Sequence, residues 1–411
     1  MRADIDRLMT ERGLDAAVVV KTETPNPTFT YLTGPGRDIS VGLLVWRRGR
    51  GGHLVHSSME RDGAAATGLE LSDFGQRGYR KLLEEEPTTG AAYARFMDET
   101  LRDLGVTGRV LVDGVGAIGR YHHILRRLAE RRPDLEIAED GDPGLFLQAR
   151  LTKDPGEVEE VKQVGAVCAR AYARVREVLG AGRLDGRRLR AGDGDGWVTI
   201  GRLRREIRRI FFDAGLIEPD GNIVAMGRDA GVPHNSGNDD DVVTEGMPIV
   251  IDLYPVQARG GYYFDVTRTY CAGRATDELR ALHACVLDSL RDVIESFRPG
   301  ARARSYQDRV CDFFEQRGHR TIRQDDRLEE GYTHGLGHGI GLEVHERPNL
   351  GGPANNPDHL TAGSLFTVEP GLYYPSRGLG VRLEDIVYAR ADGTFENLTD
   401  IPYDLEIAPA S

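Results

Sequence analysis

The sequence MPIVIDLYPVQARGGYYFDVTRTY (residues 247–270) contains two short runs of β-branched and aromatic residues, and an aspartate lies inside each run. Runs of this kind, bounded by Gly or Pro, predict β-strands. Residues 258–261 (ARGG) offer a turn between them, so the stretch predicts an antiparallel hairpin. Because side chains alternate along a strand, we expect Asp252 and Asp265 to face each other across this hairpin.

Two further predicted strands also carry an acidic residue among apolar neighbours. SLFTVEP contains Glu369, and GVRLEDIVY contains Glu384. In the second strand, alternation places Arg382 on the face of Glu384 and turns Asp385 toward the opposite face. We therefore expect Arg382 to belong to any site that Glu384 forms, and Asp385 to lie outside it.

These acidic residues need an explanation, because interior strands are normally apolar. One such residue alone is more often a solvated edge-strand residue or half of a salt bridge. Four buried carboxylates without partners would each cost on the order of several kcal/mol and would take up protons. The sequence therefore predicts that a cation lies among them.

The stretch HGLGHGIGLEVHERP (334–348) adds His334, His338 and His345. Its glycines make a stable helix unfavourable, which excludes a helical HExxH zinc motif. A single histidine is more often structural, but three within twelve positions beside four unexplained acids favour a metal site. We expect the glycines to let the backbone approach an ion closely, with His338 as a ligand.

One histidine and four carboxylates suit a pair of hard divalent ions, with manganese first and cobalt or zinc as alternatives. Four carboxylates also balance the charge of two such ions. Ions about 3.5–4 Å apart can hold a bridging water, lower its pKa and stabilise both the attacking and the developing oxygen of amide hydrolysis. The expected reaction is therefore hydrolytic.

Helical patterns surround these strands. In KDPGEVEEV the sequence offers Asp154 as a helix cap, with Pro155 at the first helical position. Apolar periodicity predicts further helices near 199–214, near 277–297 and after Ser305. The stretch 189–197, rich in Gly and Asp, predicts a mobile loop.

The chain of 411 residues is long enough for more than one domain. We predict an α+β protein with an N-terminal α/β domain (1–153) and a C-terminal domain (154–411) of helices on a mostly antiparallel sheet. The net charge of −12 disfavours a nucleic-acid partner. No apolar run approaches the roughly 18 residues of a spanning helix, and the start lacks a signal peptide, so a cytoplasmic location and no membrane partner are expected.

The motifs together resemble the metallopeptidases with the pita-bread fold, which include aminopeptidase P, proline dipeptidase, methionine aminopeptidase and creatinase. PTFTYLTG (27–34) and ARLTKDPGEVEEV (149–161) resemble the creatinase-like N-terminal domain and the domain junction of the proline-specific members. VPHN, FDVTRT, GLGHGIGLEVHE, TVEPGLYY and VRLED continue the resemblance. It implies a curved sheet and an Xaa-Pro peptidase acting on short proline-containing peptides, with a homodimer as the expected assembly.

The resemblance also implies roles for individual residues. The implied metal ligands are Asp252, Asp265, His338, Glu369 and Glu384. Among them, Asp265 and Glu384 would bridge the ions and Glu369 would act as general base. His234 and His345 would bind the substrate and steady the oxyanion, and Arg382 corresponds to the site arginine of the family.

The sequence departs from the proline dipeptidases of this family at two points. The aspartates lie two residues further apart than is usual, which predicts a longer hairpin. Residues 351–366 lack the arginine that binds a substrate carboxylate, which leaves Arg347, Arg377 and Arg382 as candidates. We expect a dipeptidase, and aminopeptidase P is the first alternative. A catalytically silent binding module is the competing hypothesis from a different class, and a side activity on organophosphates is a third hypothesis.

Overall fold

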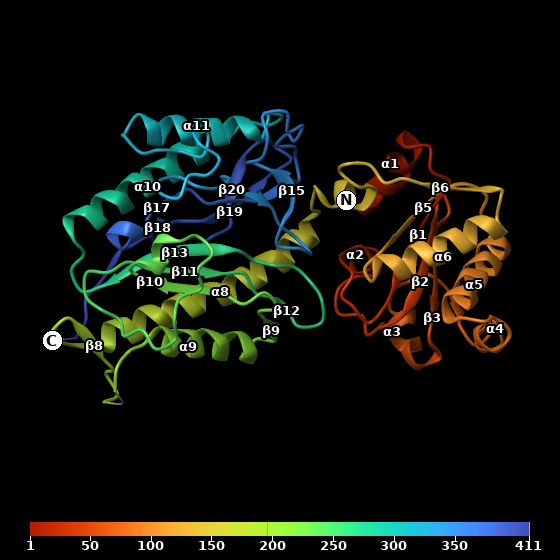
Figure 1. Cartoon of the computed structure of the whole chain (residues 1–411), viewed down its shortest axis with the longest axis horizontal. Coiled ribbons are helices and arrows are strands. Elements are labelled where there is room, and N and C mark those ends of the chain that lie inside the picture. Colours follow the sequence, from red (N-terminus) through yellow and green to blue (C-terminus); the bar gives the residue numbers. More distant parts are fainter. Residues whose placement is uncertain (195, 411) are drawn as a thin grey trace. The chain divides into compact units, whose positions relative to one another are not determined.

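The computed structural model describes residues 1–194 and 196–410. Their contacts divide them into two compact units. One contains Met1–Arg150 with Arg259–Gly261, and the other contains Leu151–Ala258 with 262–410. Figure 1 shows the elements of each unit. No helix in these ranges has the length and apolar character that crossing a membrane requires.

The first unit is built around a mixed sheet with the strand order β4-β3-β2-β1-β5-β6. Strand β1 runs antiparallel to β2 and parallel to β5. The strands are β1 (Ala16–Lys21), β2 (Gly42–Arg47), β3 (Gly51–His56), β4 (Glu70–Asp73), β5 (Gly108–Gly114) and β6 (Leu135–Ala138). The helices are η1 (Arg2–Asp4), α1 (Ile5–Glu11), α2 (Pro27–Thr33), η2 (Ser58–Glu60), α3 (Arg61–Ala65), α4 (Tyr79–Glu85), α5 (Thr89–Asp103), α6 (Ile118–Arg131) and α7 (Leu145–Arg150).

The second unit contains two larger sheets, with the strand orders β10-β11-β13-β21 and β15-β14-β16-β19-β20. Most of their pairings are antiparallel, and β13 with β21 is a parallel one. The strands are β7 (Arg183–Asp185), β8 (Arg188–Arg190), β9 (Leu216–Ile217), β10 (Ile223–Met226), β11 (Ile249–Leu253), β12 (Val256–Gln257), β13 (Val266–Ala272), β14 (His338–Gly339), β15 (Glu346–Asn349), β16 (Leu365–Val368), β17 (Gly371–Tyr374), β18 (Leu379–Arg382), β19 (Asp385–Ala389), β20 (Phe395–Asn397) and β21 (Glu406–Ile407).

Helices cover these sheets from two sides (Figure 1). Helices α8 and α9 pack together and against β10 and β13, while α10 packs against α11, β17 and β18. The helices are α8 (Pro155–Ala181), α9 (Ile200–Asp213), η3 (Asp229–Gly231), α10 (Asp277–Ser296), α11 (Arg304–Glu315) and η4 (Pro375–Arg377). The cap predicted for α8 is present, because Asp154 and Glu157 form a reciprocal capping box.

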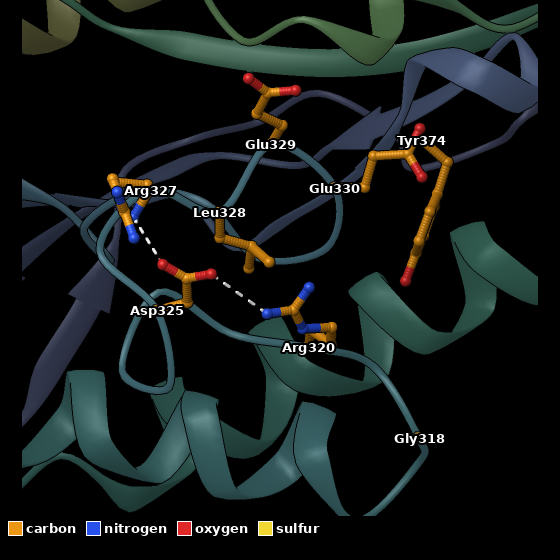
Figure 2. Close-up of a pocket in the computed structure, with 8 residues that line it drawn as sticks. All are labelled: Gly318, Arg320, Asp325, Arg327, Leu328, Glu329, Glu330 and Tyr374. Atoms are coloured by element: carbon orange, nitrogen blue, oxygen red, sulfur yellow. Dashed lines mark hydrogen bonds and ion pairs between the residues drawn. The ribbon is translucent and has the colours of Figure 1, made fainter.

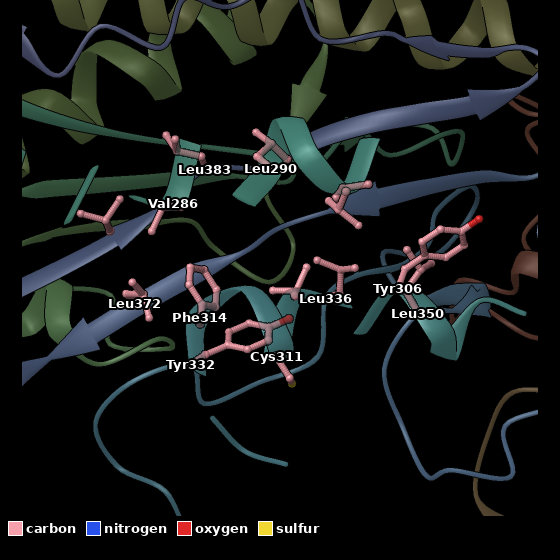
Figure 3. Close-up of a cluster of buried hydrophobic side chains, with 14 of the residues drawn as sticks. Val286, Leu290, Tyr306, Cys311, Phe314, Tyr332, Leu336, Leu350, Leu372 and Leu383 are labelled. Carbon is pink, nitrogen blue, oxygen red and sulfur yellow. The ribbon is translucent and has the colours of Figure 1, made fainter. Parts of the chain in front are cut away.

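A buried hydrophobic cluster lies between α10, α11 and the strands beside them (Figure 3). Val286 and Leu290 come from the buried stripe of α10, and Phe314 comes from α11. Leu372 and Leu383 complete the cluster from the sheet side. This apolar packing fixes β16 and β18, the strands that immediately precede Glu369 and the link containing Glu384.

The structure corrects three of the predicted segments. GVRLEDIVY is not one strand: it divides into β18 and β19, which pair with different neighbours, and Glu384 lies in the link between them. In YYFDVTRTY the strand begins only at Val266, so Asp265 precedes it. The predicted loop at 189–197 begins inside β8, and Asp195 lies outside the described residues.

Gly165 of α8 gives a test of this packing. A Cβ at Gly165 would lie 2.4 Å from the ring of Phe264, which is buried beside Asp265. We expect Gly165→Ala to lower the free energy of unfolding by about 1–2 kcal/mol, because the clash outweighs the helix propensity that alanine gains. Chemical denaturation measures this change.

Gly180 in the same helix is the matched control. The nearest atoms to a Cβ there are 3.8 and 3.9 Å away. We expect Gly180→Ala to leave stability unchanged or to raise it by about 0.5–1 kcal/mol. If both alanine variants behave alike, the close approach of α8 to Phe264 is wrong.

Candidate metal centre

The hairpin brings the two aspartates near each other, although they are not paired across it and Asp265 lies just before β13. Asp252 in β11 pairs with Thr267 in β13, and Asp265 lies two residues before Thr267. Both aspartates are buried, with 8% and 5% of their surface exposed. The Oδ1 atoms of Asp252 and Asp265 are buried without a hydrogen-bond partner among the described residues.

Three of the predicted ligands meet in one cluster. Asp265, His338 and Glu384 each offer a ligand atom, and these atoms all lie within 4.8 Å of one another. Glu369 directly follows β16, and its Oε1 is 3.6 Å from Nε2 of His338. Asp252 contributes to the charge that Asp265 experiences. The structure therefore brings all five predicted ligands into one neighbourhood.

The hydrogen bonds of His338 orient its ring. Its Nδ1 lies 3.1 Å from the carbonyl oxygen of Gly339, so Nδ1 carries the proton and donates it. The unprotonated Nε2 then lies 3.8 Å from Oδ2 of Asp265. Burial lowers the pKa of His338 to about 4, which keeps this nitrogen available as a ligand at neutral pH.

Asp265, Glu369 and Glu384 resist ionisation in the absence of a cation. Burial raises the pKa of Asp265, and the charges of Glu384, Asp252 and Glu369 raise it further. Burial likewise raises the pKa of Glu384, and it raises the pKa of Glu369 to about 8. Oxygen donors of this kind, together with one imidazole, suit a hard or borderline divalent ion. The residues present therefore fit a divalent metal centre.

Arg382 is held among these acids by four partners. Its Nη2 donates to Oδ2 of Asp252 at 2.6 Å and its Nη1 to the hydroxyl of Tyr373 at 2.9 Å. Its Nε donates to Oγ1 of Thr267 at 3.1 Å, and Nη1 also contacts the carbonyl of Pro233 at 3.2 Å. Thr267 in turn donates to Glu384 at 2.8 Å. Arg382 thus orients Asp252, and Thr267 links Arg382 to Glu384.

His334 belongs to the same network rather than to the cluster of ligand atoms. Its Nδ1 donates to the carbonyl of Gly335, so its Nε2 accepts from the hydroxyl of Tyr373 at 2.8 Å. Burial lowers the pKa of His334 to about 3. His334 is therefore neutral and supports Tyr373, which supports Arg382.

A second buried arginine, Arg268, holds the backbone beside Glu384. Its guanidinium donates to the carbonyl of Glu384 at 2.8 Å, to Asp385 at 2.8 Å and to the carbonyl of Ile401 at 2.8 Å. Its positive charge also lies 4.4 Å from the ring centre of Tyr403. Asp385 thus pairs with Arg268 at the start of β19 and is not among the clustered residues Asp265, His338 and Glu384.

The two predicted substrate-binding histidines are both exposed. The ring centre of His345 lies 4.3 Å from that of His338. His345 is nonetheless partly desolvated by its neighbours, which lowers its pKa, and the nearby charge of His234 adds to this shift. His234 follows Pro233, whose carbonyl contacts Arg382. Both histidines therefore lie at the edge of the metal centre.

Arg347 and Arg377, the other two candidates for binding a substrate carboxylate, each form an ion pair with an acidic side chain. Arg347 donates to Asp358 at 2.9 Å. Arg377 is half exposed and forms an ion pair with Glu278.

A separate surface pocket of about 440 Å³ lies between the loop of residues 318–330, which follows α11, and Tyr374 at the end of β17 (Figure 2). It is lined by charged side chains, including the pair Arg320 and Asp325 at 3.2 Å, and by Tyr374. None of the five predicted ligands lines it. This pocket is therefore distinct from the metal centre.

The sequence of the second unit matches a known family. Residues 159–391 match metallopeptidase family M24. The chain belongs to this family. The matched range contains every residue of the predicted metal centre, and the resemblance seen in the sequence is confirmed.

Relatives and solved structures extend the comparison. A probable dipeptidase PepE of Mycobacterium tuberculosis is 30% identical over 262 residues, which are 64% of this chain and 62% of the relative. An Xaa-Pro dipeptidase of Pyrococcus horikoshii is 32% identical over 172 residues, 42% of this chain and 45% of the relative. The chain thus spans less than two thirds of the length of these relatives.

The structural likeness covers nearly the whole chain. The structure of an X-Pro aminopeptidase from Thermotoga maritima aligns with a TM-score of 0.72 at 23% identity. The alignment covers 98% of this chain and 99% of the aminopeptidase chain. An Xaa-Pro dipeptidase from Bacillus anthracis has a TM-score of 0.74 at 21% identity and covers 99% of each chain. At these identities the likeness shows the fold, and the predicted pita-bread α+β fold is confirmed.

The raised pKa of Glu369 makes a prediction for the metal-free protein. The pKa of Glu369 in the folded state lies above its value in the unfolded state. The free energy of unfolding of the protein therefore falls as the pH rises toward about 8. Between pH 6.5 and 8 the unfolding free energy should fall by about 2 kcal/mol from Glu369 alone, since each pKa unit is about 1.4 kcal/mol. The buried histidines act mainly below pH 6.5, so they do not mask this window.

Denaturation of chelator-treated protein across this pH range measures the slope. Glu369→Gln should make it shallower, and saturating manganese should abolish it. A metal-free protein whose stability is flat from pH 6.5 to 8 contradicts the burial of these carboxylates.

Proposed function

We propose that this protein is a metal-dependent peptidase that hydrolyses the bond between an N-terminal residue and a following proline. The observation that carries the proposal is the buried group of Asp265, His338 and Glu384, with ligand atoms within 4.8 Å of one another, in a member of a metallopeptidase family. The names of the relatives, Xaa-Pro dipeptidase and X-Pro aminopeptidase, support the choice of substrate.

Five residues would hold two divalent ions in this proposal. They are Asp252, Asp265, His338, Glu369 and Glu384. When bound, the ions supply Lewis acidity and lower the pKa of a water molecule, and manganese is the ion we propose first. The residues around the site keep the ligand carboxylates oriented, as Arg382 does for Asp252.

The remaining steps belong to side chains of this chain. A carboxylate oxygen of Glu369 accepts the proton of the attacking water. His234 and His345, at the exposed edge of the site, bind the peptide and donate to the carbonyl oxygen as negative charge develops there. Arg382 has its donors occupied by Asp252, Tyr373 and Thr267, so it acts by fixing Asp252.

We place dipeptides ahead of longer peptides as substrates. Two of the relatives are named as dipeptidases, which supports this order. Aminopeptidase P activity on longer peptides is the alternative, since one structure of the same fold is an X-Pro aminopeptidase. The presence of all five ligand residues weighs against a catalytically silent binding module.

Metal removal tests the class of reaction. We expect the protein to cleave Ala-Pro or Met-Pro, to lose this activity in a chelator, and to recover it when manganese is added, because the carboxylates need the ions to remain ionised together. Proline release measures the activity. Failure of fully metal-loaded protein to cleave any member of a broad Xaa-Pro panel rejects the proposal.

Peptide length tests the subclass. We expect kcat/KM for Ala-Pro to exceed that for a longer peptide beginning with Ala-Pro by about tenfold or more, since a dipeptidase must use the free carboxylate of proline. The two substrates are compared at the same manganese concentration. Equal or faster cleavage of the longer peptide assigns the protein to the aminopeptidase P type.

A further inference from the structure

A buried ion pair lies outside the metal centre and has no part in the reaction described above. Nζ of Lys153 lies 2.7 Å from Oε2 of Glu346, and both side chains are 1% exposed. Lys153 immediately precedes Asp154, the cap of α8, and Glu346 immediately follows His345. A pair removed from water in this way stabilises little unless further hydrogen bonds satisfy both groups. The pair joins the segment before α8 to the residue that follows His345.

Glu346 closes the loop that carries His345. Its Oε1 accepts from the backbone NH of Leu342 at 3.0 Å and from that of Glu343 at 3.3 Å. A Cβ at Gly341 would lie 2.6 Å from Oε2 of Glu346 and 2.9 Å from Cε of Lys153. The start of the loop thus packs directly on the ion pair, and a side chain at position 341 would separate them.

Lys153 supplies a fixed point for this loop. Its backbone NH donates to the carbonyl of Gly363 at 2.8 Å, and the NH of Gly363 donates to the carbonyl of Ala389 at 2.7 Å. Thr152 forms a bridge with Ser364, which precedes β16. The ammonium group therefore extends from a segment attached to the sheet that also carries Glu369.

We propose that Lys153 and Glu346 are positioning residues that hold His345 beside the metal centre. His345 is exposed and lies in a loop of otherwise irregular backbone, yet its ring centre is 4.3 Å from that of the ligand His338. The ion pair supplies the constraint that an exposed side chain cannot obtain from packing. The inference rests on the proposed function, because the role of His345 in substrate binding does.

The test removes both charges together. Lys153→Met combined with Glu346→Gln keeps the volume of each side chain and leaves no buried unpaired charge, so the fold is retained. We expect kcat/KM for Ala-Pro to fall by about tenfold or more, as misplaced groups cause, while bound manganese per chain stays unchanged. Amide exchange at Leu342 and Glu343 in the metal-free protein should rise by about tenfold.

A partly exposed pair of the same residue types gives the matched control. Lys162 and Glu396 lie 3.0 Å apart with 38% and 26% exposure, so Lys162→Met with Glu396→Gln should retain the kcat/KM of the unaltered protein. A second comparison uses His345→Ala as background. In the His345→Ala protein, the changes at Lys153 and Glu346 should cause no further loss of kcat/KM, because they act through His345.

Three results would overturn the inference: unchanged kcat/KM and amide exchange in the buried-pair variant, an equal loss in the control pair, or a full additional loss on top of His345→Ala. Failure of the proposed function is recognised separately. The unaltered protein would then cleave no Xaa-Pro peptide, and amide exchange at Leu342 and Glu343 would alone decide whether the pair constrains the loop.

Discussion

The structure depends on the convergence of acidic side chains that repel one another. Asp252, Asp265, Glu369 and Glu384 come from separate segments of the second unit and are directed into one buried region. Burial and mutual repulsion both favour protonation, as the raised pKa values of Asp265 and Glu384 indicate. The apolar cluster behind the strands supplies the packing energy that keeps these groups together, and divalent cations would turn their repulsion into coordination.

Around the acids lies a shell of residues that fixes their orientation. Arg382 holds Asp252, Thr267 holds the side chain of Glu384, and Arg268 holds the backbone of Glu384. Tyr373 links Arg382 to His334. Outer partners of this kind restrict the movement of ligand groups, which makes a binding site less costly to organise when an ion arrives.

The sequence predicted those parts of this arrangement that depend on local pattern. The two strand-like runs and the turn between them are local features, so the sequence indicated that Asp252 and Asp265 lie close to one hairpin. Strand alternation does not itself place the acids, because Asp265 precedes β13 and Glu384 lies between β18 and β19. The capping signal at Asp154 is equally local. The sequence did not predict the roles of Tyr373 and Arg268, because their partners lie 39 and 117 residues away. It also missed the break at Glu384, since local β propensity continues through the point where the chain passes between sheets.

The position of Glu384 has a consequence for biosynthesis. It lies 132 residues after Asp252, in the link between two strands of different sheets, so the coordination sphere is complete only when both ends of this long stretch have folded. Contacts between distant segments form late, because the loop between them must close first. Under the proposed function, the full set of ligand residues would therefore be available to a metal ion only after Glu384 has joined the fold.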